Sequence, residues 1–208
     1  MGITACRRLD TPDAFPEEII VEGPVTAEQF DLYHMNDKLT NFRPPDRQKE
    51  ALKTISLMPE GMVYAARCGK EIVGYVTFHL PDKYSRWVRH PRVLELGGIE
   101  ISPDYRKRGI GAALLKKAFA NPVLEDYIVL TIEFCWHWDL KRSGLDIFSY
   151  QQMLTKLFGT VGLVRRDTDD PDILEHPANV LMVRVGKNVG GEDIALFESM
   201  LFEGKTML

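Results

Sequence analysis

The sequence predicts an α/β fold in which helices cover a mixed β-sheet. Segments rich in Val, Ile, Tyr and Phe alternate with amphipathic ones, in the order hairpin, strand, helix, strand, helix, strand. The 208 residues are 45% hydrophobic and 27% charged, which is ordinary for a globular chain that buries a core. One domain accounts for this length.

The boundaries of that domain follow from the loss of periodicity at the two ends. Residues 1–16 contain Thr, Asp and Pro without a repeating apolar pattern, so we predict a flexible leader there. Residues 17–189 form the predicted domain. Residues 190–208 form a predicted helical extension, Gly190 to Leu208, packed on the same domain through scattered apolar side chains.

The first half of the chain predicts two helices and a hairpin. Thr26 is a suitable N-cap for a helix over Ala27 to Tyr33. The break at Pro44-Pro45 precedes an amphipathic helix near Arg47 to Leu57. A short strand, Ile19 to Val21, and a hairpin joined by a Gly-containing turn complete this half; the hairpin strands are Met62 to Arg67 and Glu71 to Leu80.

The second half predicts further strands and helices. The predicted strands are Val93 to Ile101, Tyr127 to Cys135, Val161 to Arg165 and Val180 to Val185. The predicted helices are Gly109 to Ala120 and Leu145 to Phe158.

Charge, cysteine usage and hydropathy exclude several classes of function. The net charge of −4 provides no global field for nucleic acid or an anionic membrane. The three cysteines lack the spacing of a zinc site, and the histidines show no metal-ligand spacing, so we expect no metal. Neither an export signal nor an apolar membrane-spanning segment is evident, and we expect a cytoplasmic protein.

A basic, glycine-containing turn precedes the helix predicted after Ile101. A helix start offers unpaired amides and the positive end of the helix dipole to phosphate oxygens. The turn and first helical residues predicted to bind such a group are Arg106, Lys107, Arg108, Gly109, Ile110, Gly111, Ala112 and Ala113. A Rossmann fingerprint would need glycine at Leu114, and a Walker loop would need Gly-Lys-Ser/Thr, so neither alternative fits.

The segment Ile99-Glu100-Ile101-Ser102-Pro103-Asp104-Tyr105 and the turn after it resemble motif A of the GNAT N-acetyltransferases. The resemblance implies a mostly antiparallel mixed sheet that splays between two central parallel strands, flanked by helices. It also implies that acetyl-CoA lies in the gap, with its pantetheine arm on the backbone of Ile99 and Ile101. Acetyl-CoA is then the donor substrate.

Further blocks resemble the AcuA family of acetoin-utilisation protein acetyltransferases; they include Glu22-Gly23-Pro24-Val25, Phe42-Arg43-Pro44-Pro45, Trp136-His137-Trp138-Asp139 and His176-Pro177-Ala178-Asn179. This resemblance implies that the acceptor is a lysine of acetyl-CoA synthetase, which acetylation inactivates. Two alternatives remain open at this point. The acceptor could be a small amine, or the chain could be a noncatalytic acyl-CoA sensor.

Two glutamates on the strand before the turn are candidates for the general base. The acceptor amine must lose a proton before it attacks, and a carboxylate can take that proton. Glu95 and Glu100 are an odd number of residues apart, so a regular strand directs them to opposite faces. We favour Glu95, because its spacing from Arg106 resembles that of the base in GNAT histone acetyltransferases; Glu100 is the second candidate, or a carboxylate that only pairs with a neighbour.

The general acid and the acceptor surface are less defined by the sequence. Phe158 occupies the position at which GNAT enzymes often carry a tyrosine that protonates the departing thiolate. Tyr150, Cys135, His137 or water would have to supply that proton instead. The Trp136 to Asp139 run either shapes the acceptor tunnel, stacks on CoA or forms part of the core. The acidic run Asp167, Asp169, Asp170, Asp172 and Glu175 either attracts a basic partner or forms a solvated turn.

Overall fold

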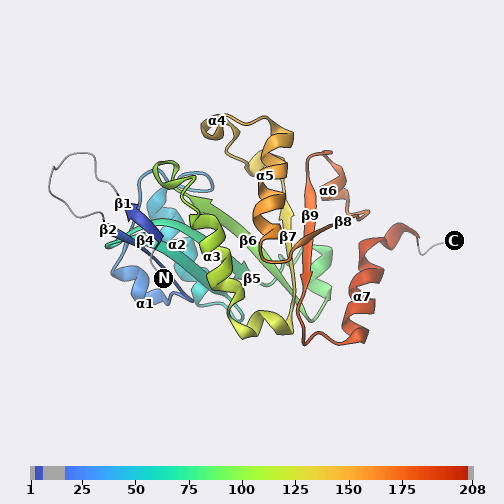
Figure 1. Ribbon diagram of the computed structural model, residues 1–208. Coiled ribbons are helices and arrows are strands. Elements are labelled where there is room, and N and C mark those ends of the chain that lie inside the picture. Colours follow the sequence, from blue (N-terminus) through green and yellow to red (C-terminus); the bar gives the residue numbers. More distant parts are fainter. Residues whose placement is uncertain (1–2, 7–16, 206–208) are drawn as a thin grey trace. The chain divides into compact units, whose positions relative to one another are not determined.

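The computed structural model describes residues 3–6 and 17–205. Figure 1 shows its strands and helices, coloured along the sequence. Contacts divide the chain into two compact units, each built from two segments. The first unit contains the chain up to Phe78 together with Gly98–Ala118, and the second contains His79–Gly97 and the chain from Phe119 onward. Strand β6 (Val93–Ile101) contributes residues to both.

The first unit consists of strands and three helices. The strands are β1 (Ile3–Cys6), β2 (Glu17–Glu22), β3 (His34–Met35), β4 (Met62–Cys68) and β5 (Glu71–His79), with the end of β6; the helices are α1 (Ala27–Asp31), α2 (Pro45–Ser56) and α3 (Ile110–Phe119). β1, β2, β4 and β5 pair antiparallel in that order, and β3 pairs parallel with β5. Helices α1 and α2 pack over β4 and β5 around Phe30, Leu39 and Leu52, which are fully buried.

Local sequence signals explain why these helices start where they do. Thr26 accepts a hydrogen bond from the Gln29 amide while Gln29 bonds back to Thr26, so a complete capping box begins α1. Pro45 opens α2, because the first helical position needs no amide donor.

The second unit places strands between two helical layers. Its strands are the first part of β6, β7 (Ile128–Glu133), β8 (Val164–Arg166) and β9 (Val180–Val185); its helices are α4 (Leu140–Ser143), α5 (Ile147–Gly159), α6 (Pro171–Leu174) and α7 (Gly191–Leu201). Leu181 and Val183 of β9 pack with Phe197 of α7. Since side chains alternate along a strand, the other β9 face is turned to α5, which contacts β8 and β9.

The predicted mixed sheet with a splayed parallel pair is confirmed. β6 runs parallel to β7, with Val93 opposite Ile128 and Glu95 opposite Leu130. No further pair joins these two strands in the described chain, although β7 continues to Glu133. β7 stays paired with β9 along its whole length.

Several predicted boundaries need correction. Residues 161–163 form a turn, with Gly162 at φ +85°, so β8 begins only at Val164. The C-terminal helix ends at Leu201, where Phe202 leaves helical geometry; residues 206–208 lie outside the described residues. Within the predicted leader, Ile3–Cys6 forms a strand through pairing with β2, a long-range effect that periodicity does not reveal; residues 7–16 lie outside the described part.

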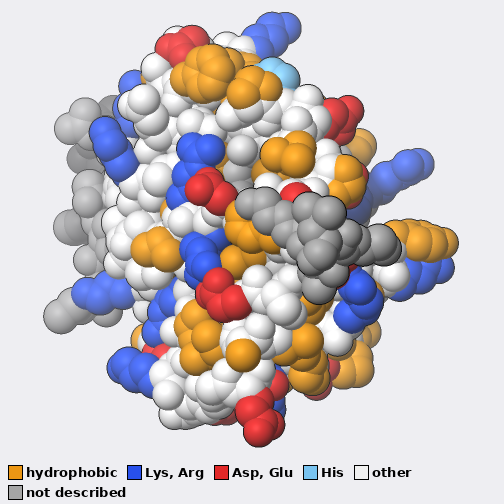
Figure 2. All heavy atoms as spheres, turned by 90° about the vertical axis from the view of Figure 1, so that its right-hand side faces the viewer, with side chains coloured by type: hydrophobic (Ala, Val, Ile, Leu, Met, Phe, Trp, Pro, Cys, Tyr) orange, Lys and Arg blue, Asp and Glu red, His pale blue; other side chains and the backbone are white. Residues whose placement is uncertain are grey.

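The C-terminal helix is tied to its unit by apolar packing and by ion pairs. Phe197, Met200 and Leu201 contribute to the same buried cluster as Trp87. Arg166 forms an ion pair with Glu198 of α7, and Arg86 donates to the Met200 carbonyl at 3.2 Å. Figure 2 shows the face that carries α7, where side chains of both charge signs are mixed with hydrophobic ones. Within the second unit, α7 is thus held by both apolar and polar contacts.

No helix in the described part of the chain is long and apolar enough to span a membrane.

Candidate active site

The end of β6 positions the basic turn in the first unit. Ser102 is fully buried, its amide donates to the Val73 carbonyl at 2.8 Å, and its hydroxyl donates to Asn36 Oδ1 at 2.8 Å. A single 3-10 turn, Pro103–Tyr105, follows and reverses the chain. Ile99 and Ile101 lie on the β6 segment immediately before this anchor, and both are partly exposed.

Two residues of the turn have left-handed backbone conformations. Lys107 has φ +60° and Gly109 has φ +75°. A Cβ built on Gly109 would meet no atom within 4 Å, so glycine is not required there by packing within this chain. The open space in front of Gly109 is instead what a closely approaching ligand needs.

Helix α3 begins directly after Gly109. The Ala113 amide donates to the Gly109 carbonyl at 3.0 Å, which closes the first helical turn. The amides of Ile110, Gly111 and Ala112 precede that bond and have no carbonyl one turn earlier within the helix. Ile110, with Leu114 and Ala118, is buried and fixes the helix, so the amides and the helix dipole form a rigid anion-binding end.

The basic side chains around this helix start are held by neighbouring groups. Arg106 donates from Nε to the Ile101 carbonyl at 3.2 Å. Arg108 stacks over the Tyr105 ring, with its guanidinium carbon 5.2 Å from the ring centroid. Together with the exposed Lys107, these side chains give a cationic rim to the free amides, and the arrangement fits a pyrophosphate group.

Glu100 is buried in the first unit, with an exposed fraction of 4%. Its carboxylate accepts a hydrogen bond from the Asn41 amide at 2.9 Å and one from the Tyr75 hydroxyl at 2.7 Å. Burial and the charge of Glu100 raise the pKa of Tyr75 far above its usual range. These contacts give Glu100 a structural task, as a link between β5, β6 and the segment before α2.

Glu95 has different surroundings, all within the second unit. Its side chain is partly exposed, on the last β6 residue that pairs with β7. Burial raises the pKa of the Glu95 carboxyl; His79 opposes this shift and Asp82 adds to it. The His79 ring lies against Gly97, where a Cβ would come within 2.0 Å of Nε2. The shift makes the Glu95 carboxylate a better proton acceptor than an exposed glutamate.

Sequence reasoning missed a second carboxyl, Glu133, at the end of β7. It accepts a hydrogen bond from the Thr131 hydroxyl at 2.8 Å. Burial raises the pKa of Glu133, Thr131 and Trp138 lower it, and the charge of Glu95 raises it. A lone carboxylate within the otherwise apolar segment Ile128–Glu133 was the signal that could have pointed to it.

The candidate acids differ in how they are held. Phe158 is fully buried, and Tyr150 stacks on Trp138 with ring centroids 5.3 Å apart. Burial raises the pKa of the Cys135 thiol and lowers the pKa of His137.

The Trp136 to Asp139 run and the acidic run are partly structural. Asp139 caps α4 and bonds Arg142 at 2.7 Å, while half-exposed Trp136 stacks on Phe134 at 4.7 Å. In the acidic run, Asp170 caps α6, and Asp169 pairs with Arg86. Asp167, Asp172 and Glu175 remain exposed.

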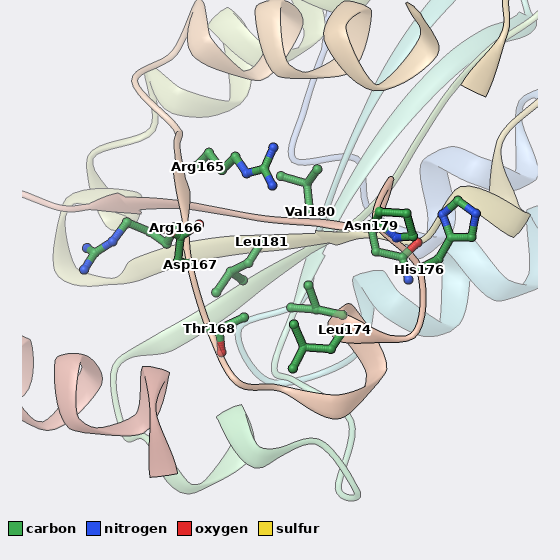
Figure 3. A pocket seen from close by; sticks show the side chains of 11 residues that line it. Arg165, Arg166, Asp167, Thr168, Leu174, His176, Asn179, Val180 and Leu181 are labelled. Carbon is green, nitrogen blue, oxygen red and sulfur yellow. The ribbon is translucent and has the colours of Figure 1, made fainter. Parts of the chain in front are cut away.

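A cavity of about 460 Å³ lies in the second unit beside β8, β9 and α6 (Figure 3). Its lining includes Arg165 and His176 as well as apolar Leu174 and Val180. None of the residues predicted to bind the cofactor or to act as the base lines it. In the described chain, no group of three His, Cys, Asp or Glu side chains is arranged to hold a metal ion.

The sequence and the fold of the chain are similar to those of known proteins. The model of the acetyltransferase (GNAT) family matches residues 30–126. The chain is 44% identical to the acetoin utilization protein AcuA of Bacillus subtilis and 42% identical to that of Bacillus licheniformis, in each case over 191 residues and 91% of both chains. A crystal structure of an acetoin utilization protein from Exiguobacterium sibiricum superposes with a TM-score of 0.89 at 40% identity, covering 99% of this chain and 95% of that one.

Proposed function

The chain belongs to the GNAT acetyltransferase family and is related to the AcuA acetoin utilization proteins along most of its length, and from this premise we propose its acceptor. The enzyme transfers acetyl from acetyl-CoA to a lysine of acetyl-CoA synthetase and thereby inactivates it. The reaction takes place in the cytoplasm and is linked to acetoin and acetate metabolism.

The donor half of this reaction follows from the family, because GNAT enzymes use acetyl-CoA. The geometry of the α3 start supports the binding mode: open space at Gly109, free first-turn amides and a cationic rim suit the pyrophosphate of CoA. We assign this role to Arg106–Gly111, with Ala112 and Ala113 behind them. The backbone of Ile99 and Ile101 is proposed to bind the pantetheine arm.

The similarity to AcuA proteins over 91% of the chain is the observation that supports acetyl-CoA synthetase as the acceptor. The raised pKa of Glu95 supports its role as general base, since a carboxylate with a raised pKa accepts a proton more readily. Glu100 remains the second candidate. Its two hydrogen bonds favour a structural role, and a substitution that preserves folding distinguishes the two roles.

Mass spectrometry of acetyl-CoA synthetase tests the proposal directly. Incubation with this enzyme and acetyl-CoA is expected to add one acetyl group, about 42 Da, to a single lysine of the synthetase. The fraction of synthetase activity lost should equal the fraction of synthetase modified. A Glu95→Gln variant should slow the modification at least about 100-fold. A synthetase that stays unmodified while the enzyme acetylates a small amine would contradict the acceptor and leave the donor assignment intact.

A further inference from the structure

The ring of Phe42 lies against β6 in the first unit, at a residue that carries no side chain. A Cβ built on Gly98 would lie 3.5 Å from Cζ of Phe42, 3.7 Å from Cε2 of the same ring and 4.0 Å from the Thr77 hydroxyl oxygen. Because Gly98 has no such atom, the tip of the ring faces the backbone of β6 directly. Phe42 comes from the segment between β3 and α2, and Thr77 comes from β5. These side chains form a wall beside the end of β6.

The segment that carries Phe42 is fixed on both sides of that residue. The Asn41 amide donates to Oε1 of Glu100 at 2.9 Å, and Nη1 of Arg43 donates to Oε1 of Gln48 at 3.3 Å. Both acceptors are buried, with exposed fractions of 4% for Glu100 and 3% for Gln48. The Phe42 side chain is itself partly buried and packs against the apolar cluster under α1 and α2. The ring is therefore held in place against β6.

The proposed donor site directs the acyl end of the donor toward this wall. In acyl-CoA the pantetheine arm joins the pyrophosphate to the thioester. The pyrophosphate is assigned to the start of α3, and the arm to the backbone of Ile101 and Ile99. The arm then runs backward along β6, and the next residue that it reaches is Gly98. The thioester is thus expected beside Gly98, where the ring of Phe42 closes one side.

We propose that Phe42 limits the length of the acyl group that the enzyme accepts. This inference rests on the proposed donor site and adds the choice of acyl group to it. An acetyl methyl fits in front of the apolar ring and contacts it. Further methylene groups would overlap the ring, and a ring that is packed and fixed on both sides moves aside only at a cost. Phe42 therefore selects acetyl-CoA over acyl-CoA donors with longer chains.

Calorimetric titration with acyl-CoA in the absence of an acceptor tests this limit. The wild type is expected to bind butyryl-CoA at least about tenfold more weakly than acetyl-CoA. Phe42→Leu removes the outer part of the ring but keeps an apolar group against the core, so the two affinities should come within about threefold of each other. Tyr33→Leu is the matched control, because Tyr33 packs against the same apolar cluster, and it should leave the ratio of affinities as in the wild type.

Transfer kinetics give a second readout. The kcat/KM for butyryl-CoA relative to acetyl-CoA is expected to rise at least about tenfold in Phe42→Leu, with an unchanged KM for the acceptor. If the affinities behave as expected but acetyl-CoA synthetase is not acetylated, the proposed acceptor fails and the acyl limit stands. Equal affinity of the wild type for the two donors, or an unchanged ratio in Phe42→Leu, overturns the limit. A raised KM for the acceptor with an unchanged donor ratio also overturns it, since the ring would then contact the acceptor.

Discussion

At the scale of single residues, the raised pKa values of Glu95 and Glu133 affect the stability of the folded chain. A carboxyl whose pKa is higher in the folded chain than in the unfolded chain costs stability once it is ionised. The cost is absent below the unfolded pKa, grows as pH rises from the unfolded to the folded pKa, and is complete above the folded pKa. Burial raises the pKa of both Glu95 and Glu133.

Glu133→Gln is therefore expected to stabilise the folded chain at pH 8. The melting temperature should rise by a few degrees at pH 8, at roughly 2–4 °C per kcal/mol for a chain of this size, and should change little at pH 4. Differential scanning calorimetry across this pH range measures the effect. A variant that melts lower at pH 8 would show that the ionised carboxylate contributes to folding instead.

Glu100 is expected to behave in the opposite way. Glu100→Ala deprives the partly buried Asn41 amide and the buried Tyr75 hydroxyl of their acceptor. A buried donor left unpaired costs about 1–3 kcal/mol. Urea unfolding measures this loss, and Tyr75→Phe, which removes one of the two donors, is the companion variant. Full stability with abolished transfer would identify Glu100 as a catalytic group.

At the scale of elements, the start of α3 is predicted to bind the donor through its backbone. Gly109→Ala places a Cβ in the open space before the helix and at φ +75°, a conformation that alanine disfavours. The dissociation constant for CoA is expected to rise at least about tenfold by calorimetric titration. Lys117→Ala, at the exposed last turn of the same helix, should leave it unchanged. If both variants bind CoA with equal affinity, the pyrophosphate does not bind at the start of α3.

The elements also show what sequence patterns can and cannot predict. Strand β6 was predicted with its observed bounds, because a long apolar run ends at Ser102-Pro103. The four-residue helices α4 and α6 were missed, since one turn carries no amphipathic period. The strand β3 is only two residues long and depends on its parallel partner β5.

The same limit applies to the candidate site. The phosphate-binding turn could be predicted, because its function depends on local backbone geometry encoded by adjacent glycines and basic residues. The partners of Glu100 could not, because Asn41 lies 59 residues away in the sequence. The pairing of Glu95 with Leu130 depends on the register of two parallel strands, which periodicity does not fix.

At the scale of the whole molecule, the chain passes between the two units three times, so neither unit corresponds to one continuous segment. The second unit needs Trp87 and Val93 from its first segment, and both are fully buried with Phe197 of its second segment. Division of the chain between Ala118 and Phe119 would therefore separate residues that form one core.

Fragments 1–118 and 119–208 are accordingly expected to remain unfolded or aggregate when expressed alone, because each contains only part of that core and exposes it. Co-expression should restore a complex that elutes at the size of the intact chain and melts cooperatively. As a control, Phe197→Ala in the intact chain should weaken the same core without dividing it. The expected loss in the free energy of unfolding is about 3–5 kcal/mol. Dispersed NMR spectra from fragment 119–208 by itself would contradict this expectation, since they would show that α7, β7 and β9 form a stable core without β6 and Trp87.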